Sequence, residues 1–359
     1  MNNTTYIIAE AGVNHNGSLS IAKQLVDIAK NSGADAVKFQ TFKAGNLVTR
    51  AVQQADYQVN NLGKATSQFE MLKNLELSFE EFLELKSYCD SLQIEFLSTP
   101  FDFESVDFLL NDIKMRKVKV PSGELTNSPF IHYIATKRKP MIVSTGMATM
   151  EDIHEALSFI AYGLGFPKKS VDLNQVKAFY QTDEAKNLLN EFVTVLHCTT
   201  EYPAPFETIN LQAITSMKEE LNLSIGFSDH SEGIAVPIAA VALGASIIEK
   251  HVTLDCNLPG PDHRASLEPN ELKEMVTGIR AIEQSLGNGN KMPTRIELKN
   301  RIVARKSIVA NKEISAGEVL TENHFAIKRA GNGMPPTAYW TLIGTVAKKS
   351  YKADELIDE

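Results

Sequence analysis

The sequence predicts an α/β protein, a (β/α)8 barrel followed by a small β-rich domain. Short runs rich in Val, Ile and Phe alternate with amphipathic stretches, and eight such pairs can be counted. Strict alternation of strand and helix implies parallel strands, and eight units over about 280 residues match the usual size of a closed barrel. From about residue 303 the pattern changes to short strands and Gly-rich turns. A doubly wound open sheet is the lesser alternative.

The strands are expected at the short apolar runs. They are residues 6–10, 36–40, 94–98, 117–121, 140–145, 193–198, 223–228 and 246–251. The crossover helices are expected where apolar residues recur at three-and-four spacing, as at Ile21, Leu25 and Ile28. They are residues 19–31, 78–92, 103–111, 127–137, 149–161, 207–220, 233–243 and 268–286. Ser78 with Glu81 three residues later is a capping signal for the second of these helices.

The domain boundary is expected after the last of these helices. Turn-rich residues follow it, so we predict a barrel over 1–286, a linker over 287–302 and a β-rich domain over 303–359. Residues 162–191 exceed a normal crossover. We interpret them as a surface insertion.

Composition excludes several classes of protein. The 359-residue chain carries a formal net charge of −8 with scattered Lys and Arg, which argues against nucleic-acid binding. No apolar run is long enough to cross a bilayer, so no membrane partner is expected. Cys89, Cys198 and Cys256 are few and far apart, which suits a reducing compartment. The expectation is a soluble cytoplasmic protein.

Polar residues gather where the predicted strands end. In a (β/α)8 barrel the active face lies at the carboxyl ends of the strands. The strand-end positions and the loop after the last strand supply Glu10, Lys38, Gln40, Thr99, Lys119, Ser122, Glu124, Thr200, Ser228, His230, His251 and Asp262. One shared cavity is therefore predicted.

Two histidines, His230 and His251, end adjacent predicted strands. Neutral imidazoles facing one cavity can hold a divalent metal, with the other positions open to water and substrate oxygens. A bound metal would polarise a carbonyl. The alternative is that each His only caps its strand.

Two lysines, Lys38 and Lys119, lie inside otherwise apolar strands. A buried Lys needs a partner, so anion binding and Schiff-base chemistry are the functional options. A structural ion pair with Glu10 or Glu124 is the alternative.

Several sequence blocks carry a family resemblance. They are IAEAGVNHNG (8–17), VKFQTF (37–42), STPFD (98–102), KVPSGE (119–124), STGM (144–147), HCTTEYPAP (197–205), FSDHSEG (227–233), EKHVTLD (249–255) and PGPDH (259–263). With these blocks the chain resembles the sialic-acid synthases. Its tail, with VARKSIVA (303–310) and KRAGNG (328–333), resembles their antifreeze-like (SAF) domain.

The resemblance implies an N-acetylneuraminate synthase, which condenses phosphoenolpyruvate with N-acetylmannosamine and water to a nine-carbon 2-keto acid and phosphate. HCTTEYPAP and GPDHRASLEP (260–269) also resemble N,N'-diacetyllegionaminate synthases, whose substrate is 2,4-diacetamido-2,4,6-trideoxymannose, so this is the alternative. The remaining hypotheses are a Schiff-base aldolase or lyase and a noncatalytic sugar-binding protein.

The resemblance also implies roles for individual residues. His230 and His251 would bind Mn²⁺ or Mg²⁺, and Glu10 and Glu124 would stabilise charge or carry protons. The phosphoenolpyruvate site would comprise Lys38, Thr99, Lys119, Ser122, Thr200 and Ser228. The sugar site would comprise Gln40, Tyr202, Asp262 and Arg329. Since Arg329 would extend over the partner's barrel, a domain-swapped homodimer is implied.

Overall fold

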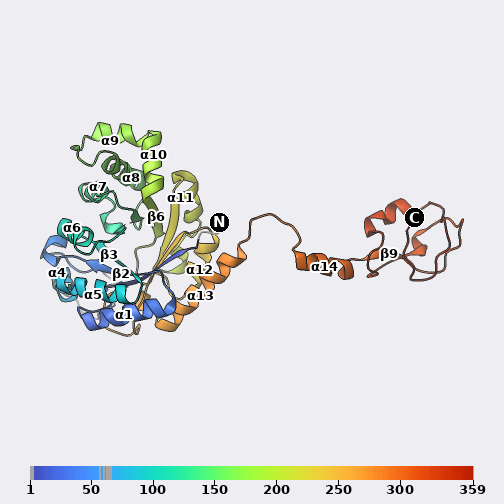
Figure 1. The fold of residues 1–359 in the computed structure, drawn as a ribbon, viewed down its shortest axis with the longest axis horizontal. Helices are drawn as coiled ribbons and strands as arrows, with labels where there is room; N and C mark the ends of the chain where they lie inside the picture. The colour runs from blue at the N-terminus through green and yellow to red at the C-terminus, as the bar shows by residue number, and fades with distance from the viewer. Residues whose placement is uncertain (1–3, 56–57, 60, 62–66, 359) are drawn as a thin grey trace. The chain divides into compact units, whose positions relative to one another are not determined.

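The computed structural model describes residues 4–55, 58–59, 61 and 67–358. The outer ends of the predicted domains, at residues 1–3 and 359, lie outside this range. The chain divides into two compact units, Met1–Leu286 and Gly287–Glu359 (Figure 1).

The first unit is built around an eight-stranded parallel sheet. Its strands are β1 Tyr6–Gly12, β2 Ala36–Thr41, β3 Glu95–Pro100, β4 Val118–Val120, β5 Met141–Ser144, β6 Val193–Cys198, β7 Ser224–Asp229 and β8 Ile247–His251. Hydrogen bonding gives the order β3-β2-β1-β8-β7-β6-β5-β4, and the two end strands β3 and β4 lie side by side. The sheet therefore closes into a barrel, and the predicted fold class is confirmed.

Helices surround this barrel between successive strands (Figure 1). The crossover helices are α1 Leu19–Ser32, α5 Phe79–Ser91, α6 Phe103–Asn111, α7 Ser128–Thr136, α8 Met150–Gly165, α11 Ala213–Leu221, α12 Ala235–Ala242 and α13 Pro269–Ser285. Ser78 and Glu81 form the expected reciprocal capping box at α5. Helix α11 begins later than the predicted residue 207, because Asn210 takes a left-handed conformation with φ of 51° that a helix cannot contain.

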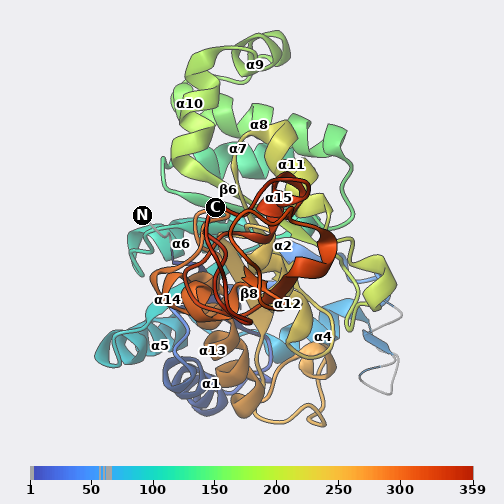
Figure 2. The same ribbon diagram turned by 90° about the vertical axis from the view of Figure 1, so that its right-hand side faces the viewer.

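Two further segments form helices that the periodicity did not predict. Short helices α2 Ala44–Leu47 and α4 Gln68–Leu75 follow β2. The insertion at 162–191 forms α9 Leu173–Tyr180 and α10 Asp183–Phe192, which stand beyond α8 on the outside of the barrel (Figure 2). Phe179 of α9 packs against Phe166 at 4.7 Å between ring centroids, so the insertion shares the hydrophobic core.

The barrel interior changes character along its axis. An apolar layer fills the lower part with Ile8, Ala36, Leu97, Ile142, Leu196 and Ile247. Burying a side chain of this size contributes roughly 1.5–3 kcal/mol. The inward-facing residues two positions further along each strand are mainly polar, as at Glu10 and Lys38. The apolar layer thus supports a polar layer at the carboxyl ends of the strands.

The second unit has its own small core, formed around Ile308, Leu320 and Tyr351. Its elements are α14 Arg295–Ala304, β9 Ser307–Ala310, β10 Phe325–Lys328, α15 Tyr339–Leu342 and the 3₁₀ turns η4 Glu322–His324 and η5 Pro336–Ala338. Strands β9 and β10 pair antiparallel. Part of the expected linker is therefore helical, as α14. No helix in the described part of the chain is long and apolar enough to cross a membrane.

Candidate active site

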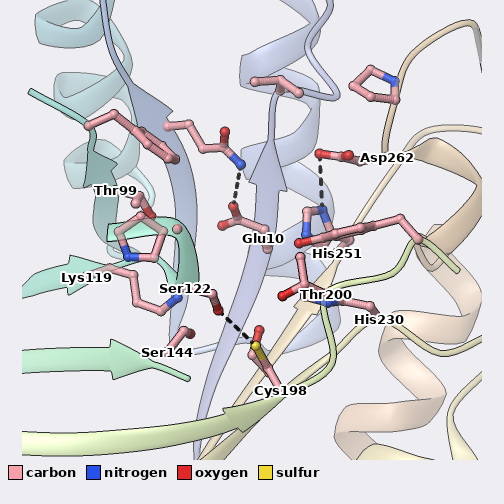
Figure 3. A pocket seen from close by; sticks show the side chains of 18 of the residues that line it. Glu10, Thr99, Lys119, Ser122, Ser144, Cys198, Thr200, His230, His251 and Asp262 are labelled. Atoms are coloured by element: carbon pink, nitrogen blue, oxygen red, sulfur yellow. Dashed lines mark hydrogen bonds and ion pairs between the residues drawn. The ribbon is translucent and has the colours of Figure 1, made fainter. Parts of the chain in front are cut away.

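A cavity of about 380 Å³ opens at the carboxyl ends of the barrel strands (Figure 3). It brings together most residues that the sequence predicted. These are Glu10, Lys38, Gln40, Thr99, Lys119, Ser122, Thr200, Tyr202, Ser228, His230, His251 and Asp262. Parallel pairing explains the gathering, since Glu10 on β1 is in register with Lys38 on β2 and with His251 on β8.

Two lysines and two glutamates form the charged floor of the cavity, which we define as Glu10, Lys38, Lys119 and Glu249. Lys38 Nζ lies 2.8 Å from Glu10 Oε2 and 3.6 Å from Glu249 Oε2, and Lys119 Nζ lies 3.2 Å from Glu249 Oε1. All four are at most 5% exposed. Each buried charge therefore has a partner, as burial requires.

Two hydroxyl groups form hydrogen bonds with the charged floor. Thr99 Oγ1 accepts a hydrogen bond from Lys38 Nζ at 2.8 Å, and Ser228 Oγ donates to Glu249 Oε1 at 2.9 Å. These bonds hold the ends of β2, β3, β7 and β8 around one point.

The floor groups differ in their electrostatics. Burial raises the pKa of Glu10 to about 7, although Lys38 opposes this. Burial also disfavours ionised Glu249, but Lys119 and Lys38 outweigh it and lower its pKa to about 2. The pKa of Lys38 is raised, because Glu10 and Glu249 together outweigh the effect of burial. The pKa of Lys119 is lowered, mainly by burial. Glu10 is thus the floor carboxyl that can exchange a proton near neutral pH.

The two histidines face the cavity with ring centroids 5.5 Å apart (Figure 3). Burial lowers the pKa of His230 to about 4 and that of His251 well below its ordinary value, so both rings are neutral near pH 7. His230 Nδ1 bonds to the Thr199 carbonyl at 2.6 Å, which leaves Nε2 for a ligand. His251 Nδ1 has no hydrogen-bond partner among the described residues and lies 3.9 Å from Asp262 Oδ2.

This donor set fits a divalent metal with open coordination positions. The described residues contain no group of three or more His, Cys, Asp or Glu side chains placed to hold an ion. Water or substrate oxygens would therefore complete the coordination. Tyr202 stacks on His230 at 4.1 Å and restricts the orientation of that ring.

A cluster of small polar groups lies just after β4 and at the ends of β5 and β6. Ser122 Oγ accepts from the Gly146 backbone N–H at 2.9 Å and contacts Cys198 Sγ at 3.1 Å. The hydroxyls of Ser144 and Thr200 are buried and have no partner among the residues that the structure describes. A Cβ on Gly146 would lie 2.1 Å from Thr200 Oγ1, so glycine keeps this space open. Unpaired buried donors beside Lys119 suit a phosphate or carboxylate.

Strand β1 ends at an irregularity that shapes the site. Its pairing with β2 shifts register between Glu10 and Gly12, a β-bulge of the kind that re-aims side chains near active sites. Gly12 has φ of +53°, and a Cβ there would crowd Glu10, Gln40 and His251 at 3.3–3.4 Å. Glycine therefore permits these three side chains to converge.

Two predicted residues are not placed in the cavity. Glu124 is half-buried in the 3₁₀ turn η1 Ser122–Glu124, accepts from Asn127 Nδ2 at 2.7 Å and does not line the cavity. Arg329 belongs to the second unit. The lysines pair with Glu10 and Glu249 among the described residues, and not with Glu124.

The prediction omitted several residues that line the cavity. Glu249 lines the cavity as the ion-pair partner of both lysines. Ser144 and Cys198 line it as well (Figure 3). Glu249 had a usable signal, since a carboxylate inside an apolar strand needs a partner as much as a lysine does. An apolar part of the lining, contributed by α2 and α4, had no such signal.

Known proteins resemble the chain over nearly its whole length. N,N'-diacetyllegionaminic acid synthase from Campylobacter jejuni is 46% identical, covering 99% of both chains. The enzyme of the same name from Legionella pneumophila is 43% identical, covering 95% of this chain and 90% of that protein. The crystal structure of N-acetylneuraminic acid (sialic acid) synthetase from Leptospira borgpetersenii is 32% identical with a TM-score of 0.66, covering 84% of this chain and 92% of that one.

These identities correct one expectation. N-acetylneuraminate synthase, the leading sequence-based interpretation, is wrong as the first choice, because the two diacetyllegionaminic acid synthases are distinctly more similar than the sialic acid synthetase. The sequence blocks could not decide this because they describe the charged floor and the histidine pair. They cover few of the residues that α2 and α4 contribute to the cavity lining.

Family profiles agree with these likenesses. The SAF domain profile matches residues 305–359. The NeuB family profile matches residues 25–291, which is most of the chain. With its closed barrel, its strand-end cavity and this match, the chain is an enzyme that belongs to the NeuB family.

Proposed function

We propose that this enzyme is an N,N'-diacetyllegionaminate synthase. It would condense phosphoenolpyruvate with 2,4-diacetamido-2,4,6-trideoxymannose and water, and release phosphate. The observation that carries the reaction is the charged floor facing two neutral histidines in one cavity. The choice of sugar is supported by the two relatives at 46% and 43% identity.

Phosphoenolpyruvate would bind on the floor and the adjoining small polar groups. Lys38 and Lys119 supply positive charge to its carboxylate and phosphate. The hydroxyls of Thr99, Ser122, Ser144, Thr200 and Ser228 supply hydrogen bonds. Two of them, on Ser144 and Thr200, are buried and have no partner among the described residues. The lysines here bind the substrate and form no imine, because both are engaged by carboxylates.

His230 and His251 would hold Mn²⁺ or Mg²⁺. When bound, the ion would act as a Lewis acid on the sugar aldehyde. The protein would contribute neutral, largely buried imidazoles, one of them oriented by the Thr199 carbonyl.

The chemistry begins when C3 of phosphoenolpyruvate attacks the aldehyde carbon of the open-chain sugar. A C–C bond forms, the aldehyde oxygen takes a proton, and C2 becomes electron-poor. Water adds to C2, and its lost proton passes to a base. The C–O bond to phosphate then breaks, the C2 hydroxyl passes its proton to the departing phosphate, and C2 becomes the carbonyl of the 2-keto acid. We assign the proton transfers to Glu10, whose pKa of about 7 suits both directions. Glu124 takes no step, because it does not line the cavity.

The sugar would be held by Gln40, Tyr202 and Asp262, which line the cavity. Tyr202 stacks on His230, and Asp262 Oδ2 lies 3.9 Å from His251 Nδ1. Arg329 of the second unit would reach a partner's cavity in a domain-swapped homodimer. We place the reaction in the cytoplasm, which the free thiols of Cys89, Cys198 and Cys256 favour.

The test is turnover with a panel of sugars. Phosphate release and product mass should show highest kcat/KM with 2,4-diacetamido-2,4,6-trideoxymannose and lower kcat/KM with N-acetylmannosamine. Chelation with EDTA should abolish turnover and Mn²⁺ should restore it, while borohydride with pyruvate should trap no adduct. Preference for N-acetylmannosamine would overturn the sugar assignment. Activity after complete chelation, or a trapped lysine, would overturn the mechanism.

A further inference from the structure

The cavity has a second, apolar half that the chemistry above does not use. We define it as the apolar wall, formed by Val13, Leu47, Val48, Met71, Leu72 and Leu75. We propose that the apolar wall selects the sugar by its remote end, receiving the methyl group at C6 and disfavouring a hydroxyl there. This inference rests on the proposed condensation and names the part of the cavity that decides its substrate.

The apolar wall is a built feature. Val13, Met71 and Leu75 are 4%, 6% and 8% exposed and form a hydrophobic cluster of their own, separate from the main core. Leu47 and Leu72 pack against this cluster while still lining the cavity. The wall is therefore held by the packing of its own side chains, as the lining of a binding pocket usually is.

Its position follows from the chain topology. Helices α2 and α4 both lie between β2 and α5, and so belong to the loop that leaves the carboxyl end of β2. Residues of α2 and α4 line the cavity, whereas the small polar groups proposed to bind phosphate lie just after β4 and at the ends of β5 and β6. The cavity is thus polar on one side and apolar on the other.

The reacting end of the sugar has to lie over the floor. Its aldehyde must meet both phosphoenolpyruvate and the histidine pair, so carbons C4 to C6 extend into the remaining space. The apolar wall supplies much of that space, with Gln58 and Gln68 as the amide side chains of the same region. Amides suit acetamido groups, and Leu, Val and Met side chains suit methyl groups.

The size of the effect can be bounded. A hydroxyl placed on an apolar wall loses water without gaining a hydrogen bond. An apolar pocket rejects an added hydroxyl by roughly 10–100-fold in kcat/KM. We therefore expect a 6-deoxy sugar to be preferred over its 6-hydroxy counterpart by that factor.

The experiment compares N-acetylmannosamine with 2-acetamido-2,6-dideoxymannose, which differ only in the 6-hydroxyl, and includes the diacetamido sugar. The variants are Val48→Thr, which keeps the shape, and Leu72→Asn. The matched controls are Val52→Thr and Leu83→Asn, whose side chains are 42% and 43% exposed and do not line the cavity. Thermal melting of each purified full-length variant verifies folding.

We expect Val48→Thr and Leu72→Asn to lower the 6-deoxy preference by about 3–10-fold each, with the KM for phosphoenolpyruvate unchanged and the controls at wild-type ratio. An unchanged ratio in folded Val48→Thr and Leu72→Asn overturns the apolar wall. A 6-deoxy preference without turnover of the diacetamido sugar overturns the proposed function but supports the wall. No turnover of any sugar overturns both.

Discussion

The residues of the charged floor form ion pairs with one another, because a buried charge without a partner would be costly. Glu249 is the shared partner, because it accepts from Ser228 and pairs with both Lys38 and Lys119. Removing one member of a buried ion pair leaves the other charge without compensation and costs about 3–5 kcal/mol. Surface pairs lack this penalty because water solvates each charge.

Glu249→Gln should therefore lower the free energy of unfolding by about 3–5 kcal/mol. The matched control is Glu84→Gln, which breaks the exposed Lys23–Glu84 pair and should cost less than about 1 kcal/mol. Urea unfolding monitored by circular dichroism measures both. Equal losses in the two variants would show that Glu249 does not compensate the lysines.

Gly146 controls the space around the hydroxyls of Ser122 and Thr200, which we propose bind the phosphate. Gly146→Ala places a methyl group 2.1 Å from Thr200 Oγ1, so we expect the KM for phosphoenolpyruvate to rise about tenfold or more, as overpacking of 1–3 kcal/mol implies. Gly45→Ala is the control, since a Cβ there meets no atom within 4 Å and Gly45 does not line the cavity. Steady-state kinetics at saturating sugar measures both, and similar KM values in the two variants would contradict the role of Gly146.

At the scale of elements, a buried ion pair joins the ends of β7 and β8 on the face that points away from the cavity. Asp229 and Lys250 are cross-strand partners, both fully buried, with Lys250 Nζ 2.7 Å from Asp229 Oδ2. Each immediately precedes one histidine of the pair. Because successive strand residues point to opposite faces, this ion pair lies behind the strands while the histidines face the cavity. The pair thus positions His230 and His251.

Lys250→Met should weaken Mn²⁺ binding by about 10–100-fold, the usual effect of losing support behind a metal ligand. The double variant Asp229→Asn with Lys250→Met should recover much of the lost stability, because no buried charge remains, but little of the metal affinity. Isothermal titration with Mn²⁺ and thermal melting separate the two effects. Metal affinity that follows stability in both variants would mean that the pair serves folding alone.

At the scale of the whole molecule, two separately packed units share one proposed reaction. The barrel carries the cavity, and the second unit, with its own core, carries Arg329. Exchange of small units between protomers gives a closed dimer in which each active site uses two chains. The proposed homodimer has this form.

Mixing Arg329→Ala with His230→Ala tests the exchange. Each variant alone should have little sugar turnover, whereas dissociated and reassociated mixtures should regain about a quarter of wild-type activity, since half the dimers would contain one intact site. Phosphate release before and after mixing is the measurement. No recovery, despite mixed dimers detected by native mass spectrometry, would argue that each chain completes its own site.

The amino-acid sequence alone determined the barrel and the strand-end residues. These are local signals, because an apolar run that gives way to polar residues, as at Lys38 or at Glu249, shows where a strand ends. A buried charge at such a position also requires a polar partner. Tertiary structure decided which partners meet. Lys119 pairs with Glu249 and not Glu124, and helices α2 and α4 form an apolar wall. Those outcomes depend on strand register and on packing between segments far apart in the chain, and neither is encoded in the spacing of neighbouring residues.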